Sequence, residues 1–311
     1  MSAPPVPDQH GRTAVVTGAN SGLGLASARA LAAAGARVLL ACRNPERAAA
    51  ALDDVRAAAI GPAPETVRLD LADLDSVAAC ADDIAGRTDS LDVLINNAGI
   101  MAPPRSHTAQ GFETQFGVNH LGHFALTGRL LPTLLAASAP RVVTVSSAGH
   151  RAGWIHWDDL AAERHYSAWL RYGQSKLANL LFTAELARLA GVHDTALVAV
   201  AAHPGYAATS LTHNGPGNRG ANRIMDTLTG IGDRLLAQSS EQGAIPQLHA
   251  ATASDVVGND YFGPDGFLEQ SGKAAKRVGR SRQASDAGAA RRLWEVSTEM
   301  TGVDYPWAAS D

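Results

Sequence analysis

The chain has 311 residues, enough for one large domain or two small ones. Lys and Arg number 26 against 30 Asp and Glu, so the formal net charge is −4, whereas a nucleic-acid-binding protein usually has a basic surplus on one face. Hydrophobic residues make up 46% and charged residues 18%, which excludes a disordered chain. Two cysteines, Cys42 and Cys80, exclude a disulfide scaffold and a four-cysteine metal site.

The N-terminal residues 1–11 contain no apolar signal core, and no run reaches the roughly 18 uninterrupted apolar residues of a membrane span. We therefore expect a flexible arm over 1–11, one domain over 12–311, and a cytoplasmic protein with no membrane and no nucleic-acid partner. His120 and His123 form an H-x-x-H pair in an expected helix. Packing explains such a pair better than metal binding, so no metal site is predicted.

Short apolar runs alternate with alanine-rich helical stretches along the chain. Strands are expected at 13–16, 36–41, 67–69, 91–95, 141–145 and 196–201. Helices are expected at 22–34, 45–59, 73–84, around 110–137 and at 171–190. The strands lack a clear polar–apolar alternation, as in a sheet covered by helices on both faces. The pattern predicts an α/β fold, a single-domain Rossmann-type doubly wound parallel sheet with helices on both faces.

Residues 205–235 differ from this alternation, because they are rich in Gly, Asn and Thr with scattered apolar side chains. A long irregular insertion after a strand is a functional lid or a mobile linker. Ligands bind at the carboxyl edge of such a sheet, so we expect a substrate lid.

The first strand is followed by a glycine loop with the spacing G-x-x-x-G-x-G. Such glycines allow a tight turn and let backbone N–H groups approach a pyrophosphate at the helix N-terminus. A glycine-rich turn can be purely structural, but its place at the first strand–helix junction predicts dinucleotide binding. The expected cofactor contacts in the loop are Gly18, Asn20, Ser21, Gly22, Leu23 and Gly24.

Arg43 stands nineteen residues after Gly24, at the end of the second expected strand. An acidic residue about 20 positions after the loop would bind the adenosine 2′-hydroxyl and favour NAD. A guanidinium instead suits a 2′-phosphate. We therefore predict NADP(H) as the preferred cofactor, with NAD(H) possible; the alternative for Arg43 is a solvated loop cation.

Tyr172 and Lys176 are four residues apart, so on a helix they share one face. A phenol with a pKa of about 10 is a poor base at neutral pH. A neighbouring ammonium favours the phenolate, so the pair predicts that Tyr172 exchanges a proton near pH 7. In isolation the pair could be an ordinary helix surface pair, but its place after the fifth strand favours the chemistry.

Further motifs stand in a fixed order with the glycine loop and the Tyr–Lys pair: Asn96-Asn97-Ala98-Gly99, Asn119 in GVNHLGHF, Ser146-Ser147 after RVVTV, and His203-Pro204-Gly205. In this order the chain resembles the short-chain dehydrogenase/reductase family. The segments LLACRN, SKLANLLFTAEL, YFGPDGF and RRLWEVSTEMTG, with 25 residues from Ser147 to Tyr172, resemble its retinol-dehydrogenase-like branch.

The resemblance implies an oxidoreductase that transfers a hydride between NADP(H) and a small-molecule carbonyl or alcohol. Tyr172 would be the acid/base, and Lys176 would lower its pKa and hold the nicotinamide ribose. Ser147 would bind the substrate oxygen; strand register and the spacing to Tyr172 favour it over the adjacent Ser146. Asn119 would support a water path to Lys176, or serve as a helix-kink or capping amide.

The same resemblance implies further cofactor contacts. Asp70 with Leu71 resembles an adenine-contacting position, although a carboxylate at a strand end could equally cap the next helix. The remaining implied contacts are Asn97, Ala98, Gly99, Pro204, Gly205 and Thr209.

Trp154, Ile155 and Trp157 lie between Ser147 and Tyr172 and could wall a hydrophobic substrate pocket, with Trp154 as a substrate contact. They predict a lipophilic aldehyde, ketone or alcohol as substrate, unless the tryptophans only pack on the lid.

Other interpretations stay open. The chain could be an NAD(P)-dependent epimerase or dehydratase, or an NADPH-binding sensor or scaffold protein without turnover. Apolar faces of the helices near 110–137 and 171–190 could pair subunits in a homodimer or homotetramer, or pack on the sheet. The basic run at 273–282 is expected to be a solvated surface loop.

Overall fold

The structure is a computed structural model that describes residues 6–205 and 239–307. Most of the predicted lid, including Thr209, lies outside the described residues.

The described part of the expected flexible arm is docked, which corrects that prediction. Val6 packs against the core, and Gln9 is buried with its backbone N–H bonded to the carbonyl oxygen of Ala34 at 2.8 Å.

The central sheet contains eight strands among the described residues, in the order β3-β2-β1-β4-β5-β6-β7-β8. All neighbours are parallel except β7 and β8. The strands are β1 (Thr13–Thr17), β2 (Arg37–Cys42), β3 (Glu65–Arg68), β4 (Val93–Asn96), β5 (Arg141–Val145), β6 (Val198–Ala202), β7 (Tyr261–Pro264) and β8 (Ala275–Arg277). The first six confirm the predicted strands, whereas β7 and β8 were not predicted. β8 lies in the basic run, so residues 275–277 are a strand rather than a loop, although Lys276 and Arg277 are exposed as expected.

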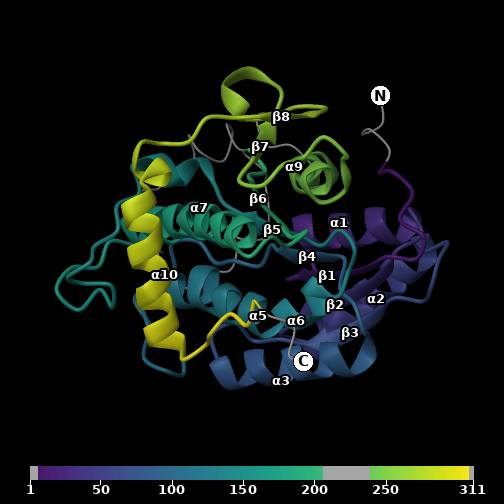
Figure 1. Cartoon of the computed structure of the whole chain (residues 1–311), viewed down its shortest axis with the longest axis horizontal. Coiled ribbons are helices and arrows are strands. Elements are labelled where there is room, and N and C mark those ends of the chain that lie inside the picture. The colour runs from purple at the N-terminus through teal and green to yellow at the C-terminus, as the bar shows by residue number, and fades with distance from the viewer. Residues whose placement is uncertain (1–5, 206–238, 308–311) are drawn as a thin grey trace, which may run out of the picture.

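Helices cover both faces of the sheet, as predicted (Figure 1). The helices α1 (Gly22–Ala33), α2 (Pro45–Ala58) and α9 (Ser240–Thr252) contribute to one apolar core. The helices α3 (Leu74–Arg87), α5 (Gly122–Arg129) and α7 (Ala168–Val192) contribute to the other. Neighbouring strand residues alternate between the two, so that Val15 faces the second core and Val16 the first. The fold is thus a Rossmann-type α/β fold.

The single long helix expected around 110–137 is instead broken into four pieces, which corrects the prediction. A short α4 (Thr114–Phe116) leads into a π-helical turn η1 (Gly117–Leu121), then α5, then α6 (Leu131–Leu135). In the π turn the N–H of Gly122 bonds to the carbonyl oxygen of Gly117, five residues back. Pro132 stands in the first turn of α6 and cannot donate the backbone hydrogen bond that a continuous helix requires.

The C-terminal helix α10 (Ala287–Thr301) packs across α7 (Figure 1). The Trp294 ring stacks on Phe182 at 5.9 Å and meets Phe124 edge-on at 5.1 Å. Beyond α10, the hydroxyl of Tyr305 donates to the carbonyl oxygen of Phe124 at 2.7 Å. Much of the apolar surface of α5 and α7 thus packs on the sheet and on the C-terminal segment, and the pairing of subunits stays a prediction.

The described part of the chain contains no helix with the length and apolar character that crossing a membrane requires. The H-x-x-H histidines take part in separate hydrogen bonds. His120 Nε2 lies 2.8 Å from Ser297 Oγ, and His123 Nε2 lies 3.0 Å from Thr17 Oγ1.

Candidate active site

A groove of about 270 Å³ lies at the carboxyl ends of β1, β2 and β4, where the strand order reverses direction. It brings together all the predicted residues from the glycine loop, the ends of the next strands and the N-N-A-G motif. These are Gly18, Asn20, Ser21, Gly22, Leu23, Gly24, Arg43, Asp70, Leu71, Asn97, Ala98 and Gly99. Residues from four separate segments of the sequence thus line one surface.

The glycine loop needs its glycines for two reasons. Gly18 and Gly22 have positive φ angles of 67° and 54°, which side chains disfavour. A Cβ on Gly24 would lie 2.4 Å from the carbonyl oxygen of Gly18, so α1 could not start so close to β1. The first turn of α1 carries no acidic residue. The helix N-terminus therefore offers backbone N–H groups and a positive dipole end without an opposing charge, which fits the pyrophosphate of a dinucleotide.

Two arginines line the far end of the groove, Arg43 and Arg47. Arg47 was missed by the sequence reasoning, although it follows from the helix start: Asn44 caps α2 by accepting a hydrogen bond from the N–H of Arg47 at 2.7 Å. Asp70 lines the same groove and does not cap α3, because Asp73 does. Asp70 instead accepts a hydrogen bond from the N–H of Ala72 at 3.0 Å.

Beyond the groove, Ser147, Tyr172 and Lys176 form a cluster that we call the buried cluster. Tyr172 and Lys176 are 9% and 5% exposed on α7, and the Lys176 ammonium lies 5.7 Å from the centre of the Tyr172 ring. Ser147 follows β5, and its hydroxyl oxygen and the Tyr172 ring both lie against Gly149. A Cβ on Gly149 would lie 3.2 Å from Tyr172 Cε1, so the ring packs tightly against the turn after β5.

Burial controls the acid–base properties of this cluster. Burial raises the pKa of Tyr172, and the hydrogen bond from Ser147 opposes that rise. Burial also lowers the pKa of Lys176 to about 8. In the protein alone the net shift of the Tyr172 pKa is upward because of burial, and the lowering of that pKa by Lys176 stays a prediction. Tyr172 is a protonated phenol at neutral pH, able to donate its proton.

The two serines after β5 have different partners. Ser146 is buried and its hydroxyl donates to the carbonyl oxygen of Lys176 at 2.8 Å. Ser147 Oγ accepts a hydrogen bond from the N–H of Gly149 at 3.1 Å and faces Tyr172. Ser146 supports the helix that carries the lysine, whereas Ser147 lies beside the phenol.

Asn119 lies in the π turn and joins three segments. Its side chain accepts a hydrogen bond from the N–H of Ile100 at 2.8 Å and donates to Ile100 O and Ser175 Oγ, both at 2.9 Å. A Cβ on Gly99 would lie 3.2 Å from Asn119 Oδ1 and 3.3 Å from Lys176 Nζ. These contacts fit the kink-amide interpretation and place Asn119 next to the lysine; the water path stays a prediction.

The comparisons with known proteins agree with this geometry. The sequence profile of the family described as short chain dehydrogenase matches residues 12–219. The chain belongs to the short-chain dehydrogenase/reductase family. It is 40% identical over 297 residues to retinol dehydrogenase 12 of Mus musculus, covering 95% of this chain and 88% of the relative. It is also 40% identical over 299 residues to retinol dehydrogenase 13 of Homo sapiens, covering 95% and 86%.

One solved structure is similar over nearly the whole chain. It is the crystal structure of a putative uncharacterized protein from Mycobacterium paratuberculosis, 42% identical, with a TM-score of 0.80 over 98% of this chain and 99% of that one. The chain is thus an NAD(P)-dependent short-chain dehydrogenase/reductase of retinol-dehydrogenase-like sequence.

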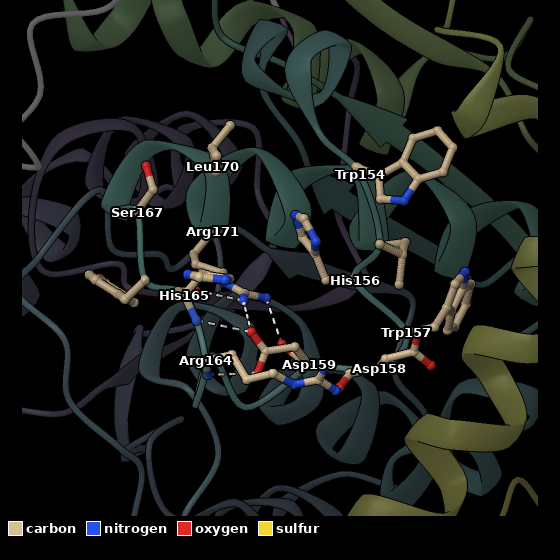
Figure 2. Close-up of a pocket in the computed structure, with 12 residues that line it drawn as sticks. Trp154, His156, Trp157, Asp158, Asp159, Arg164, His165, Ser167, Leu170 and Arg171 are labelled. Atoms are coloured by element: carbon tan, nitrogen blue, oxygen red, sulfur yellow. Dashed lines mark hydrogen bonds and ion pairs between the residues drawn. The ribbon is translucent and has the colours of Figure 1, made fainter.

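A second cavity, of about 440 Å³, lies beside the N-terminal turn of α7 (Figure 2). Trp154 lines it, but Ser147 and Tyr172 do not. Arg171 and Asp159, which also line the cavity, pair at 2.7 Å and hold the loop before α7 in place (Figure 2). The role of Trp154 as a substrate contact therefore stays a prediction for this short-chain dehydrogenase/reductase.

Two further features lie near the buried cluster. Trp169, which the sequence reasoning missed, meets the Tyr172 ring edge-on at 6.3 Å from one helical turn earlier. Its signal in the sequence is the i, i+3 spacing to Tyr172. After β6, Pro204 and Gly205 turn the chain; a Cβ on Gly205 would lie 2.5 Å from the carbonyl oxygen of Gln270.

Proposed function

We propose that the protein transfers a hydride between NADP(H) and a lipophilic carbonyl or alcohol substrate, with Ser147, Tyr172 and Lys176 as catalytic residues. The observation that carries this proposal is the buried Tyr172 phenol, which packs against the turn that carries Ser147 and lies one helical turn from Lys176. The cluster combines a proton donor, a hydroxyl for the substrate oxygen and a cation.

The groove residues would hold the cofactor. The start of α1 suits the pyrophosphate, and the N-N-A-G residues suit the adenosine side of the molecule. Arg43 and Arg47, both exposed at the groove, supply two positive charges for a 2′-phosphate. This charge supports NADP(H) over NAD(H).

When bound, the nicotinamide supplies or accepts the hydride. In the reducing direction Tyr172 donates its proton to the substrate oxygen, while Ser147 hydrogen-bonds the same oxygen. The phenolate that remains on Tyr172 is stabilised by Lys176, whose pKa of about 8 leaves it mainly as an ammonium at neutral pH. In the oxidising direction the Tyr172 phenolate accepts the proton of the alcohol, so Tyr172 has to release its own proton before each turnover.

The lipophilic substrate class has two supports. The relatives are named retinol dehydrogenases, and retinol is a lipophilic alcohol. In this chain, Trp169 is 65% exposed and contacts the Tyr172 ring, so an apolar surface lies beside the phenol. Large exposed aromatic side chains next to a catalytic group favour an apolar ligand.

A substrate panel tests the proposal. Purified protein is assayed with NADPH and with NADH against medium- and long-chain aldehydes, ketones and small sugars. We expect oxidation of NADPH with lipophilic carbonyls and a lower kcat/KM with NADH. Activity confined to polar sugars would overturn the substrate class, and NADPH binding without any turnover would favour the sensor function. Product isomerisation without net NADPH oxidation would favour the epimerase.

A further inference from the structure

His150 lies three residues after Ser147, in the turn that follows β5, and takes part in none of the steps above. We propose that His150 is a positioning residue for Ser147: a neutral imidazole that ties Ser147 to Ser281 in the C-terminal part of the chain. The inference rests on the proposed catalytic role of Ser147.

The hydrogen bonds of His150 define its tautomer. The side chain is completely buried. Its Nδ1 lies 2.7 Å from the carbonyl oxygen of Ser147, which can only accept, so Nδ1 carries the proton. Its Nε2 lies 3.3 Å from the backbone nitrogen of Ser281, which can only donate, so Nε2 is the bare acceptor. A doubly protonated ring would point one N–H at another and lose the Ser281 bond.

The groups around His150 favour the neutral ring. Tyr261 meets it edge-on at 5.6 Å. Burial lowers the pKa of His150, and the positive charges of Arg151 and Arg280 lower it further; the hydrogen bond to Ser147 and the negative charge of Glu269 oppose this lowering. His203 also packs against Tyr261, at 5.2 Å, and its Nε2 lies 3.2 Å from Glu269.

Ser281 is a firm anchor because its neighbourhood is tied to the sheet. The guanidinium of Arg280 lies over the Tyr261 ring at 5.8 Å and donates to the carbonyl oxygen of Asp260 at 3.2 Å. The N–H of Val278 bonds to the carbonyl oxygen of Tyr261 at 2.8 Å. The basic segment is thus bonded to the start of β7, and its Ser281 N–H donates to Nε2 of His150.

On its other side His150 closes the turn that aims Ser147 at Tyr172. The carbonyl oxygen of Ser147 accepts from the backbone N–H of His150 at 3.1 Å as well as from Nδ1. The Ser147 hydroxyl oxygen accepts from Gly149, which leaves the hydroxyl proton for Tyr172 or for a substrate oxygen. Loss of the Nδ1 bond leaves the Ser147 carbonyl oxygen with the backbone N–H of His150 alone, at 3.1 Å, so Ser147 is held less firmly. A displacement of about 1 Å at a catalytic group costs on the order of 10²-fold in rate.

Three substitutions separate the two bonds. In His150→Asn the side-chain amide replaces Nδ1 and keeps the donor to Ser147, whereas the acceptor for Ser281 is lost. In His150→Gln the side-chain oxygen reaches the Nε2 position and keeps the acceptor, whereas the donor to Ser147 is lost. His150→Ala loses both. The Asn and Gln variants each leave one bond unmade, so they are matched controls for stability.

We expect His150→Asn to keep kcat within about threefold, and His150→Gln and His150→Ala to lower it by roughly 10- to 100-fold. The dissociation constant of NADPH, measured by fluorescence titration, should stay within about twofold in all three. In ¹⁵N–¹H spectra the signal that disappears in His150→Asn should be that of a neutral ring protonated at Nδ1, the less common tautomer.

Equal kcat losses in the Asn and Gln variants would overturn the inference, because volume or stability alone would explain them. An Nε2-protonated or charged His150 signal would overturn it too, as would a parallel loss of NADPH affinity. Ser147→Ala separates this inference from the proposed function. If Ser147→Ala keeps wild-type kcat, the proposed function fails. If Ser147→Ala lowers kcat but His150→Gln and His150→Ala keep it, the positioning role fails alone.

Discussion

The groove and the buried cluster are adjacent parts of one site, but they are built differently. The groove is shaped by backbone: glycines with positive φ, a close approach of α1 to β1, and exposed arginines at its end. The buried cluster is shaped by side chains that are removed from water and contact one another. The groove should therefore control cofactor affinity and the cluster the chemical step, and substitutions should separate the two.

The largest separation should come from Tyr172→Phe. The phenyl ring keeps the packing on Gly149 and removes only the hydroxyl, so proton transfer is lost. We expect kcat to fall by roughly 10²- to 10⁴-fold while the NADPH dissociation constant changes by less than about twofold. Steady-state kinetics and a fluorescence titration measure the two. A variant that keeps more than a tenth of the wild-type kcat would show that the phenol is not the acid.

Arg43→Ala should have the reverse effect. Its guanidinium lies at the end of the groove, and loss of charge-assisted hydrogen bonds to a 2′-phosphate should weaken NADPH binding by roughly 10- to 100-fold. Binding of NADH, which lacks that phosphate, and kcat at saturating NADPH should be unchanged.

Arg47→Ala is the matched control for Arg43→Ala, because it removes the second arginine of the groove without touching the first. We expect its loss of NADPH affinity to be smaller and also specific to NADPH. Equal losses of NADPH and NADH affinity in Arg43→Ala would mean that the arginine shapes the groove rather than reads the phosphate.

The two regions also differ in how far the sequence predicts them. In the groove, the glycine loop and Arg43 were predicted because each follows a strand and parallel strands end at one edge. The N-N-A-G residues and Asp70 were implied by the family resemblance, and Arg47 was missed. The Tyr–Lys pair was predicted from its i, i+4 spacing. The rise of the Tyr172 pKa was not, because it depends on burial by the turn that carries Gly149.

What the sequence could not predict depends on distant contacts. Strand β8 is three residues long and exists through its antiparallel pairing with β7. The π turn at Asn119 depends on bonds to Ile100 and Ser175. The bond between His150 and Ser281 spans 131 residues. Neither local periodicity nor a short motif contains such information.

Gly99→Ala tests the junction between the two regions. Its added Cβ would lie 3.2 Å from Asn119 Oδ1 and 3.3 Å from Lys176 Nζ, so one of these side chains has to move. We expect kcat/KM to fall about tenfold, with changes in both kcat and the NADPH dissociation constant. Gly86→Ala is the control, because an added Cβ there meets no atom within 4 Å. If Gly99→Ala changed the NADPH dissociation constant and left kcat unchanged, Gly99 would act on the groove and not on the buried cluster.

The smallest expected effect is on the free energy of unfolding at acidic pH, through the buried His120. Burial lowers the pKa of His120 to about 3. Ser297 Oγ donates its own proton to the carbonyl oxygen of Leu293, so at 2.8 Å it accepts from His120 Nε2. The unfolded chain binds a proton near the ordinary pKa of about 6.5, whereas the folded protein does not, so stability is lost as pH falls below that value. Between pH 7 and pH 5.5 this group alone should remove about 1 kcal/mol from the free energy of unfolding.

His120→Gln keeps a donor for Ser297 and removes the titrating group. Urea denaturation of both proteins at pH 7 and pH 5.5 should show a smaller loss of stability in the variant, by about 1 kcal/mol. Equal losses of stability in the two proteins would mean that burial does not keep His120 neutral in the folded state.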